Sequence, residues 1–213
     1  MAAVLERAGA QTCIRHFGAV ELVAIVEAMR SFTARRDRAT PDELWLLEHP
    51  PVYTLGQGAD RRHGPRIDNA IPVVRVERGG EITYHGPGQV VLYTLVDLTR
   101  RGIKVRAFVA LLEACVIDLL AEEGVAAARR AGAPGVYVRG AKVAALGLRV
   151  TRGRAWHGVA LNVDVDLAPF AAIDPCGYAG LAVTRTRDLG IAASSAELGE
   201  RLARKLEERL DRA

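Results

Sequence analysis

Three amphipathic segments with helical spacing divide this chain of 213 residues, and short β-type runs occupy the two intervals between them. The first segment extends from about Val20 to Arg36, the second ends near Gly124, and the third contains the leucines from Leu198 to Leu210. Apolar residues three and four positions apart lie on one face of a helix. Since the helices do not alternate strictly with single strands, the order disfavours a doubly wound fold. We therefore expect an α/β chain of the α+β type, with a mixed β-sheet and packed helices.

The expected strands are short, and many are bounded by glycine or proline. β-Branched and aromatic residues in such runs are typical of strands. The runs are Glu43 to Leu47, Val52 to Leu55, Val73 to Val76, Val90 to Val96, Val136 to Val138, Val143 to Val150 and Val159 to Val165. In the middle helix, Cys115 belongs to the apolar stripe, so we expect this thiol in the core.

Half of the residues are hydrophobic, which is enough for one substantial core, and we interpret residues 1–213 as a single domain. A charge pair, Glu6-Arg7, precedes any apolar run long enough for a signal peptide, and no segment reaches a membrane-spanning length. We therefore expect a cytoplasmic protein without a membrane partner. The wide spacing of Cys13, Cys115 and Cys176 disfavours a disulfide framework or a Cys-x-x-Cys zinc site, so we expect reduced thiols.

The formal net charge of +4 comes from 29 basic and 25 acidic residues that are spread along the chain. The sequence lacks the aromatic interleaving of a nucleic-acid surface, so we expect no nucleic-acid partner. We interpret the densest basic run, Arg35 to Arg38 with Arg61 to His63 beyond it, as a solvated face or loop. Weak electrostatic attraction of an acidic carrier protein remains open.

Cys176 lies between Pro175 and Gly177, outside any periodic apolar segment. Proline fixes its own φ and glycine tolerates unusual backbone angles, so the two residues can present the thiol at a sharp, exposed turn. A thiolate at such a turn could attack a carbonyl carbon. The pentapeptide Asp174 to Tyr178 is, by itself, also consistent with a small apolar residue in an ordinary turn.

The run from Arg78 to Gln89 places four glycines and a proline around His85, between two expected strands. Missing side chains let a ligand lie against the main chain, and exposed amides supply hydrogen-bond donors. The run lacks both the Gly-Lys-Ser/Thr ending of a P-loop and the Gly-x-Gly-x-x-Gly spacing of a dinucleotide site. Phosphate binding is therefore weakly supported, and a purely structural connection between strands is the alternative.

Lys142 follows a turn, and on a strand its side chain shares a face with Ala144, whose small size leaves room for a pocket. A solvent-exposed lysine is the alternative interpretation. The stretch from Trp156 to Val163 combines His157 and Gly158 with an otherwise apolar strand. Such a strand suits the wall of a narrow slot for a hydrocarbon chain.

Taken together, these segments closely resemble the lipoyl(octanoyl) transferase family, whose bacterial enzymes move an octanoyl group from acyl carrier protein to lipoyl domains. The resemblance covers most of residues 14 to 190. Its segments are Glu48 to Gln57, Arg78 to Gln89, Gly135 to Val138, Lys142 to Arg149, His157 to Asn162 and Pro175 to Gly177. The departures from the family pattern are small: Val143, Leu146 and Thr184-Arg185-Thr186.

The resemblance implies a biotin/lipoate protein ligase-like fold, in which a second smaller sheet and helices accompany the mixed sheet. It implies that the acyl group is carried on Cys176 and that Lys142 is the second catalytic residue. The implied acyl pocket consists of Arg78, Gly79, Gly80, Glu81, Ile82, Thr83, Tyr84, His85, Ala145, Leu146, Gly147, Gly158, Val159 and Ala160. Neither a cofactor nor a metal is expected.

The resulting hypothesis is transfer of an octanoyl or lipoyl group through a Cys176 thioester, the first step of endogenous lipoate cofactor assembly. The implied donor is octanoyl-acyl carrier protein, and the implied acceptors are lipoyl domains of 2-oxoacid dehydrogenase E2 subunits and the glycine cleavage H protein. One alternative is an ATP-dependent lipoate or biotin protein ligase, with an acyl-adenylate in the glycine-rich loop. Another is a module that binds such domains without turnover. A third is a zinc site made by His49, His85 and His157.

Overall fold

The computed structural model describes residues 12–59, 65–67, 69–174 and 180–212 of the chain. Cys176 lies outside these ranges, together with its neighbours Pro175 and Gly177. The basic residues from Arg61 to His63 also lie outside the described residues.

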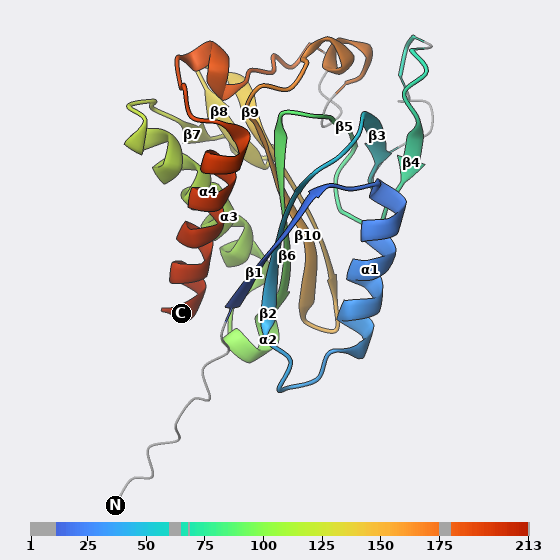
Figure 1. The fold of residues 1–213 in the computed structure, drawn as a ribbon, viewed down its shortest axis with the longest axis vertical. Helices are drawn as coiled ribbons and strands as arrows, with labels where there is room; N and C mark the ends of the chain where they lie inside the picture. Colours follow the sequence, from blue (N-terminus) through green and yellow to red (C-terminus); the bar gives the residue numbers. More distant parts are fainter. Residues whose placement is uncertain (1–11, 60–64, 68, 175–179, 213) are drawn as a thin grey trace, which may run out of the picture.

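The larger sheet is mixed and has the strand order β1-β2-β6-β10-β9-β8-β7 (Figure 1). Its outer pair, β1 and β2, is parallel, and the other neighbouring strands are antiparallel. The strands are β1 (Thr12–Ala19), β2 (Asp42–Glu48), β6 (Gln89–Asp97), β7 (Ala128–Arg129), β8 (Gly135–Val138), β9 (Ala141–Thr151) and β10 (Arg154–Asn162).

A smaller sheet of three strands, in the order β4-β3-β5, stands beside one end of the larger sheet (Figure 1). Its strands are β3 (Val52–Leu55), β4 (Val73–Arg75) and β5 (Ile82–His85). β3 pairs in parallel with β4 and antiparallel with β5. The expected mixed sheet with a second, smaller sheet is therefore confirmed.

Helices cover both faces of the larger sheet, with α1 on one face and α3 and α4 on the other (Figure 1). The helices are α1 (Leu22–Arg35), the short α2 (Leu98–Arg101), α3 (Val105–Glu122), α4 (Ser195–Asp211) and the 3₁₀ turns η2 (Ala168–Ala172) and η4 (Thr186–Leu189). These bounds confirm the three amphipathic helices, and Cys115 is 1% exposed, as its place in the apolar stripe predicts. Burial raises the pKa of the Cys115 thiol to about 11, so this cysteine is held as an unreactive thiol.

Strand β6 shows how the two layers of helices share one sheet. All of its residues are buried. Val90 and Leu92 join the core under α3 and α4, whereas Val91 and Tyr93 join the core under α1. Successive side chains of a strand point to opposite faces, so a central strand between two helix layers needs no polar face.

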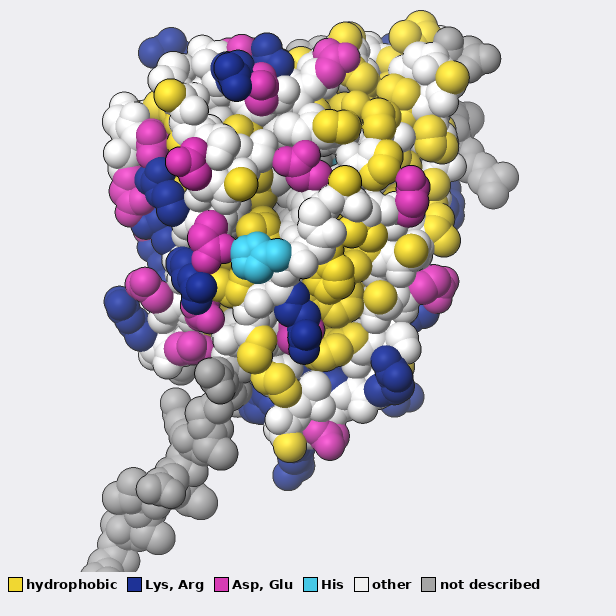
Figure 2. Space-filling view, viewed as in Figure 1, with side chains coloured by type: hydrophobic (Ala, Val, Ile, Leu, Met, Phe, Trp, Pro, Cys, Tyr) yellow, Lys and Arg dark blue, Asp and Glu magenta, His cyan; other side chains and the backbone are white. Residues whose placement is uncertain are grey.

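The two sides of the molecule differ in surface character. In Figure 2, charged side chains gather over α4, and hydrophobic side chains gather over the small sheet and α1. Ion pairs join α4 to α3, with Arg201 on Glu122 and Glu123 and with Arg209 on Asp118. Exposed pairs of this kind contribute little each, so the buried leucine stripe of α4 supplies most of its docking energy.

Three strands were not expected from the sequence, and one was placed wrongly. β1 is an edge strand whose residues are mostly exposed, so it carries no apolar alternation. β5 lies inside the glycine-rich run, and β7 has two residues. β10 begins at Arg154 and ends at Asn162, whereas the apolar run predicted a strand from Val159 to Val165.

The interpretation of the basic run as solvated is wrong for Arg36. Its side chain is fully buried and donates to the Asp42 carboxylate, which is fully buried as well. Arg100, Arg101 and the main-chain N–H of Asp97 donate to the same carboxylate. Burial alone would raise the pKa of Asp42, but these donors outweigh it and hold the pKa below its ordinary value.

Replacing Asp42 by Asn should destabilise the chain by about 3–5 kcal/mol, because the Arg36 guanidinium would stay buried without a counter-charge. Urea unfolding at neutral pH measures this change. The matched control is Asp188→Asn, which removes one of two carboxylates that pair with Arg185 at the surface and should change stability by less than about 1 kcal/mol. Equal losses in the two variants would contradict the assigned role of Asp42.

Candidate active site

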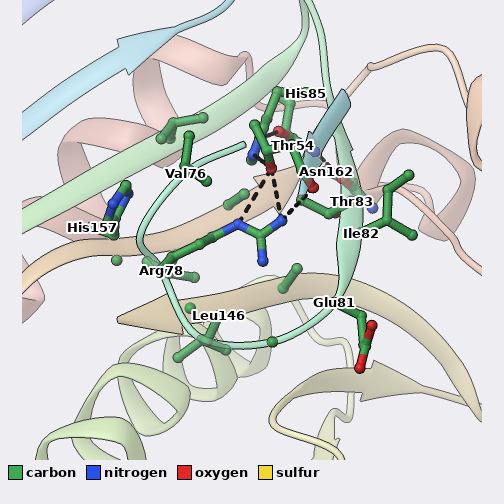
Figure 3. Close-up of a pocket in the computed structure, with 18 of the residues that line it drawn as sticks. Thr54, Val76, Arg78, Glu81, Ile82, Thr83, His85, Leu146, His157 and Asn162 are labelled. Atoms are coloured by element: carbon green, nitrogen blue, oxygen red, sulfur yellow. Dashed lines mark hydrogen bonds between the residues drawn. The ribbon is translucent and has the colours of Figure 1, made fainter. Parts of the chain in front are cut away.

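A pocket lies between the α1 side of the larger sheet and the small sheet, and most of the predicted site residues line it. Figure 3 shows Arg78 extending across this space toward Thr54, with Ile82 and Thr83 on one side and His157 on the other. The predicted residues in its lining are Arg78, Gly80, Glu81, Ile82, Thr83, His85, Lys142, Ala145, Leu146, Gly147, Gly158, Val159 and Ala160. Three segments far apart in the sequence therefore meet at one cavity.

Two predicted residues do not belong to this lining. Tyr84 packs its ring against Tyr53 and Phe170, at 5.6 and 5.4 Å between ring centroids, in the core of the small sheet. Gly79 donates its main-chain N–H to the carbonyl of Leu148 at 2.9 Å. The Gly79 bond holds the glycine-rich run against β9, and the Tyr84 contacts hold it in the core of the small sheet.

Gly147 explains how closely this run approaches β9. A Cβ atom at Gly147 would lie 3.0 Å from Cδ of Arg78 and 3.1 Å from the carbonyl oxygen of Gly79. A side chain there would push the loop away. The Arg78 stem therefore forms part of the pocket wall because β9 has no side chain at position 147.

A buried chain of hydrogen bonds links the small sheet to the larger one (Figure 3). Arg78 Nη2 donates to Thr54 Oγ1 at 2.7 Å, and that hydroxyl lies 3.4 Å from His85 Nε2. His85 Nδ1 lies 2.7 Å from Gln89 Oε1. The Gln89 amide nitrogen donates to Asn162 Oδ1 at 2.9 Å, which fixes its oxygen as the acceptor from His85. His85 therefore carries its proton on Nδ1, and its Nε2 accepts from Thr54.

Burial is the main reason why the pKa of His85 falls to about 3, and the nearby His49 ring and Arg78 guanidinium lower it further. His85 is thus neutral within this series of hydrogen bonds at every pH at which the protein is expected to work. A neutral ring can donate at one nitrogen and accept at the other, which this chain requires.

His49 and Tyr93 extend this polar layer toward α1. His49 Nδ1 lies 2.7 Å from the carbonyl of Val20, so this nitrogen carries the proton. Burial lowers the pKa of His49, and its neutral Nε2 then accepts from the Tyr93 hydroxyl at 2.8 Å. Burial raises the pKa of Tyr93 well above its ordinary value, which keeps this hydroxyl protonated.

His157 adopts a strained conformation beside Tyr93. Its φ is 64°, in the left-handed region that bulky residues seldom adopt. This angle interrupts the alternation of β10, so the rings of Trp156 and His157 stack at 4.7 Å instead of pointing to opposite faces. His157 also lies edge-on to Tyr93, with 5.7 Å between centroids. Its buried Nε2 has no hydrogen-bond partner among the described residues.

Burial lowers the pKa of His157 to about 3, with a further contribution from the Arg78 guanidinium. Within the described ranges, no group of three or more His, Cys, Asp and Glu side chains is arranged to hold a metal ion. The ring nitrogens of His49 and His85 instead bond to the protein, as described above. The described residues also include no helix long and apolar enough to cross a membrane.

Lys142 is 3% exposed, although a lysine after a turn is ordinarily solvated. Its Nζ donates to the carbonyl of Pro134 at 3.3 Å and lies 5.3 Å from the centre of the Tyr137 ring. Gly135 makes room for it, because a Cβ there would lie 3.1 Å from Lys142 Cε. The buried Glu113 of α3 holds this bend through the N–H of Gly135 at 3.0 Å.

The main chain of Lys142 is paired with the segment from Ala182 to Thr184. Its N–H donates to Ala182 at 2.8 Å, and its carbonyl accepts from Thr184 at 2.9 Å. Asn162 adds a third bond, from its side-chain amide to the Thr184 carbonyl at 3.0 Å. Lys142 is thus tied to the stretch of chain that follows Cys176, and Cys176 itself lies outside the described residues.

Several lining residues were not predicted as catalytic or acyl-pocket residues: Leu22, Thr54, Val76, Gln89, Val91, Tyr93, His157, Asn162, Phe170 and Val183. Thr54, Gln89 and Asn162 stand inside motifs that the sequence already singled out, and a buried polar residue at a strand end is a signal that could have found them. From the sequence alone, Tyr93 and Val91 are expected to be core residues of a strand. Nothing in their sequence spacing distinguishes a pocket wall from ordinary packing.

The fold has known counterparts. Residues 25–207 match the family model of the lipoyl protein ligase A/B catalytic domain. A lipoate-protein ligase A bound with ATP superposes with a TM-score of 0.71 at 14% identity, covering 95% of this chain and 92% of that one. The biotin protein ligase from Aquifex aeolicus in complex with biotin and ATP gives 0.60 at 11% identity, covering 92% and 69%. The biotin/lipoate ligase-like fold is therefore confirmed.

Curated relatives define the family more narrowly. An octanoyltransferase of Aromatoleum aromaticum is 59% identical over 91% of this chain and 84% of its own. An octanoyltransferase of Dechloromonas aromatica is 56% identical over 93% and 96%. This chain belongs to the octanoyltransferase family, whose members are acyltransferases, and the resemblance inferred from the motifs is confirmed.

Burial of neutral histidines predicts that the protein is least stable in acid. The pKa of His85 and of His157 falls from 6.5 to about 3 on folding, so between these values only the unfolded chain binds the proton. Stability is therefore fully present above pH 6.5 and falls as the pH decreases, by up to about 1.4 kcal/mol per pH unit for each ring.

Unfolding free energies from urea titrations between about pH 7 and pH 5, above the range in which carboxylates titrate, measure this slope. The His157→Asn variant should lose one ring's share of it, because asparagine does not titrate and tolerates positive φ. An unchanged slope in that variant would contradict the burial of a neutral His157.

Proposed function

We propose that this enzyme transfers an octanoyl or lipoyl group from acyl carrier protein to the target lysine of lipoyl domains, through a thioester on Cys176. The observation that carries the proposal is the position of Lys142. It is a buried lysine on the wall of a largely apolar pocket, and its main chain is paired with the segment that follows Cys176. The same chemistry is the first step of endogenous lipoate cofactor assembly.

The pocket supports an acyl substrate because its side chains offer apolar contact along two strands. Ala145 of β9 is in register with Ala160 of β10, and alternation places both small side chains on the pocket side of the sheet. Leu146 and Val159, the next pair, turn their side chains into the core under α3 and α4. Each buried CH₂ group contributes about 0.8 kcal/mol, so an octanoyl chain would supply much of the binding energy without any ionic contact. The predicted residues from Arg78 to His85 would enclose this chain, with Tyr84 and Gly79 acting from outside the lining.

In the first step, the Cys176 thiolate attacks the carbonyl carbon of the octanoyl thioester. A new carbon–sulfur bond forms, the carbon–sulfur bond to the carrier breaks, and the departing thiol takes a proton from the Lys142 ammonium. A free cysteine has a pKa of about 8.5, so a nearby ammonium is needed to favour the thiolate at neutral pH. One thioester replaces another, and the exchange is nearly neutral in free energy.

In the second step, the amine of the acceptor lysine attacks the acyl-enzyme. A carbon–nitrogen bond forms, Cys176 leaves as a thiolate, and the neutral Lys142 amine accepts the proton released by the nucleophile. The product is an amide, which is more stable than the thioester, so this step drives the reaction. The cycle restores the thiolate and the ammonium and requires no ATP.

The proposed partners are octanoyl-acyl carrier protein as donor, and the lipoyl domains of 2-oxoacid dehydrogenase E2 subunits and the glycine cleavage H protein as acceptors. The family membership of the chain supports octanoyl as the acyl group. The cytoplasm is the compartment we propose, since reduced thiols are required for a cysteine nucleophile.

An ATP-dependent ligase is the second candidate, because solved structures of this fold include ligases with bound ATP. Incubation with ATP and free octanoate separates the two candidates. Formation of octanoyl-adenylate without carrier protein would favour the ligase.

Exposure of the protein to octanoyl-acyl carrier protein should raise its intact mass by one octanoyl group, located on the Cys176 peptide. Cys176→Ala should abolish both the mass increase and transfer to a lipoyl domain. The control is Cys115→Ala, which should keep turnover and lose roughly 1–2 kcal/mol of stability, because Cys115 is a buried core thiol. A stable but inactive Cys115→Ala would show that the wrong cysteine has been chosen.

Two substitutions of Lys142 separate its charge from its ability to exchange a proton. In Lys142→Met, alkylation of Cys176 by iodoacetamide should require a higher pH, since the positive charge is gone. Lys142→Arg restores a charge that cannot be deprotonated at ordinary pH. It should recover part of the alkylation rate without recovering transfer to the lipoyl domain. An unchanged alkylation profile in Lys142→Met would remove the lysine as the group that activates the thiol.

A further inference from the structure

The pocket lining includes two polar aromatic side chains whose rings pack edge-on, His157 and Tyr93, together with Leu22 of α1. All three residues are at least nine-tenths buried. His157 lies beyond the Arg78 stem, on the opposite side from Ile82 and Thr83 (Figure 3). Its Nε2 is buried and has no hydrogen-bond partner within the described part of the chain. A buried polar atom is ordinarily hydrogen-bonded, so water or a polar ligand atom in the pocket is the expected partner of this nitrogen.

The register of the sheet places the His157 imidazole at the opposite end of the pocket from Lys142. His157 is opposite Leu148 on β9, which is six residues beyond Lys142. Six residues of an antiparallel strand span about 20 Å, and the lysine and histidine side chains fill part of that length. An extended octanoyl chain is about 9 Å long, given carbon–carbon bonds of roughly 1.5 Å. An acyl chain whose carbonyl end lies at Lys142 therefore approaches the His157 imidazole when it is about as long as an octanoyl chain.

An acyl chain gains affinity from each CH₂ group as long as it contacts apolar walls, by a factor of about four for every group buried. The gain in affinity per CH₂ group stops where the acyl chain contacts His157. A terminal methyl against the ring would exclude the water or polar atom that Nε2 needs, and an unmade buried hydrogen bond offsets the gain from at least one further CH₂ group.

We propose that His157 limits the length of the acyl chain that the pocket accepts. The inference rests on the proposed acyl pocket and assigns its specificity to a residue remote from Lys142. The left-handed backbone at position 157 is part of this arrangement, because it turns the imidazole onto the same side as Trp156 and Tyr93. A residue in ordinary strand geometry would point to the other face.

Calorimetric titration of the full chain with hexanoate, octanoate, decanoate and dodecanoate tests the proposal without any transfer step. In the natural sequence, affinity should rise about fourfold per CH₂ group and then stop rising near octanoate. His157→Leu should extend the rise by one or two further CH₂ groups. His157→Gln is the matched control, since it has a similar size and equal backbone strain but keeps a polar end, and it should retain the natural limit.

Nuclear magnetic resonance of the natural sequence, with ¹⁵N-labelled histidine, provides a measurement that does not depend on the folding of a variant. Decanoate should shift the His157 Nε2 signal, and hexanoate should leave it unchanged. Three results would overturn the proposal. The affinity could continue to rise through dodecanoate, the chain-length limit could be the same in His157→Leu, or the Nε2 signal could stay unchanged when decanoate binds. Absence of acyl transfer with the limit intact would count against the proposed function alone.

Discussion

The pocket depends on one constraint, the buried chain of hydrogen bonds from Arg78 through Thr54, His85 and Gln89 to Asn162. Thr54 and His85 belong to the small sheet, and the last two residues belong to the larger one. Apolar surfaces alone could slide past each other, whereas these polar groups bond to particular partners at short, defined distances. Breaking any link leaves a buried group unsatisfied, at a cost of about 1–3 kcal/mol. The angle between the sheets, and hence the pocket, is thereby fixed.

The same series of hydrogen bonds continues to the proposed reaction centre. Asn162 holds the carbonyl of Thr184, and Thr184 pairs with the main chain of Lys142. The lysine side chain is directed by the Pro134 carbonyl, next to a glycine that Glu113 holds in place. Lys142 and His157 both line the pocket, and the register of β9 and β10 separates them along the strands. This arrangement suits a substrate that is reactive at one end and hydrocarbon elsewhere.

How much the sequence predicts depends on the kind of signal. Periodicity located the three long helices and the core position of Cys115, because burial of one face leaves a regular pattern. It missed β1, an exposed edge strand, and β5, where glycines around Ile82–His85 hide a strand in an apparent loop. Arg78, Lys142 and Gly147, which the motifs singled out, line one cavity. The side on which Tyr84 packs, and the left-handed angle of His157, follow from tertiary contacts that no local pattern records.

Chemical competence of the acyl-enzyme tests the central claim most directly. The protein would be loaded from octanoyl-acyl carrier protein with a labelled acyl group, separated from donor and nucleotides, and mixed with a lipoyl domain in a rapid-quench instrument. The account predicts that the label moves from the enzyme to the lysine of the domain in a single turnover without ATP, at least as fast as steady-state turnover. Label that stays on the enzyme, or moves only when ATP is added, would contradict it.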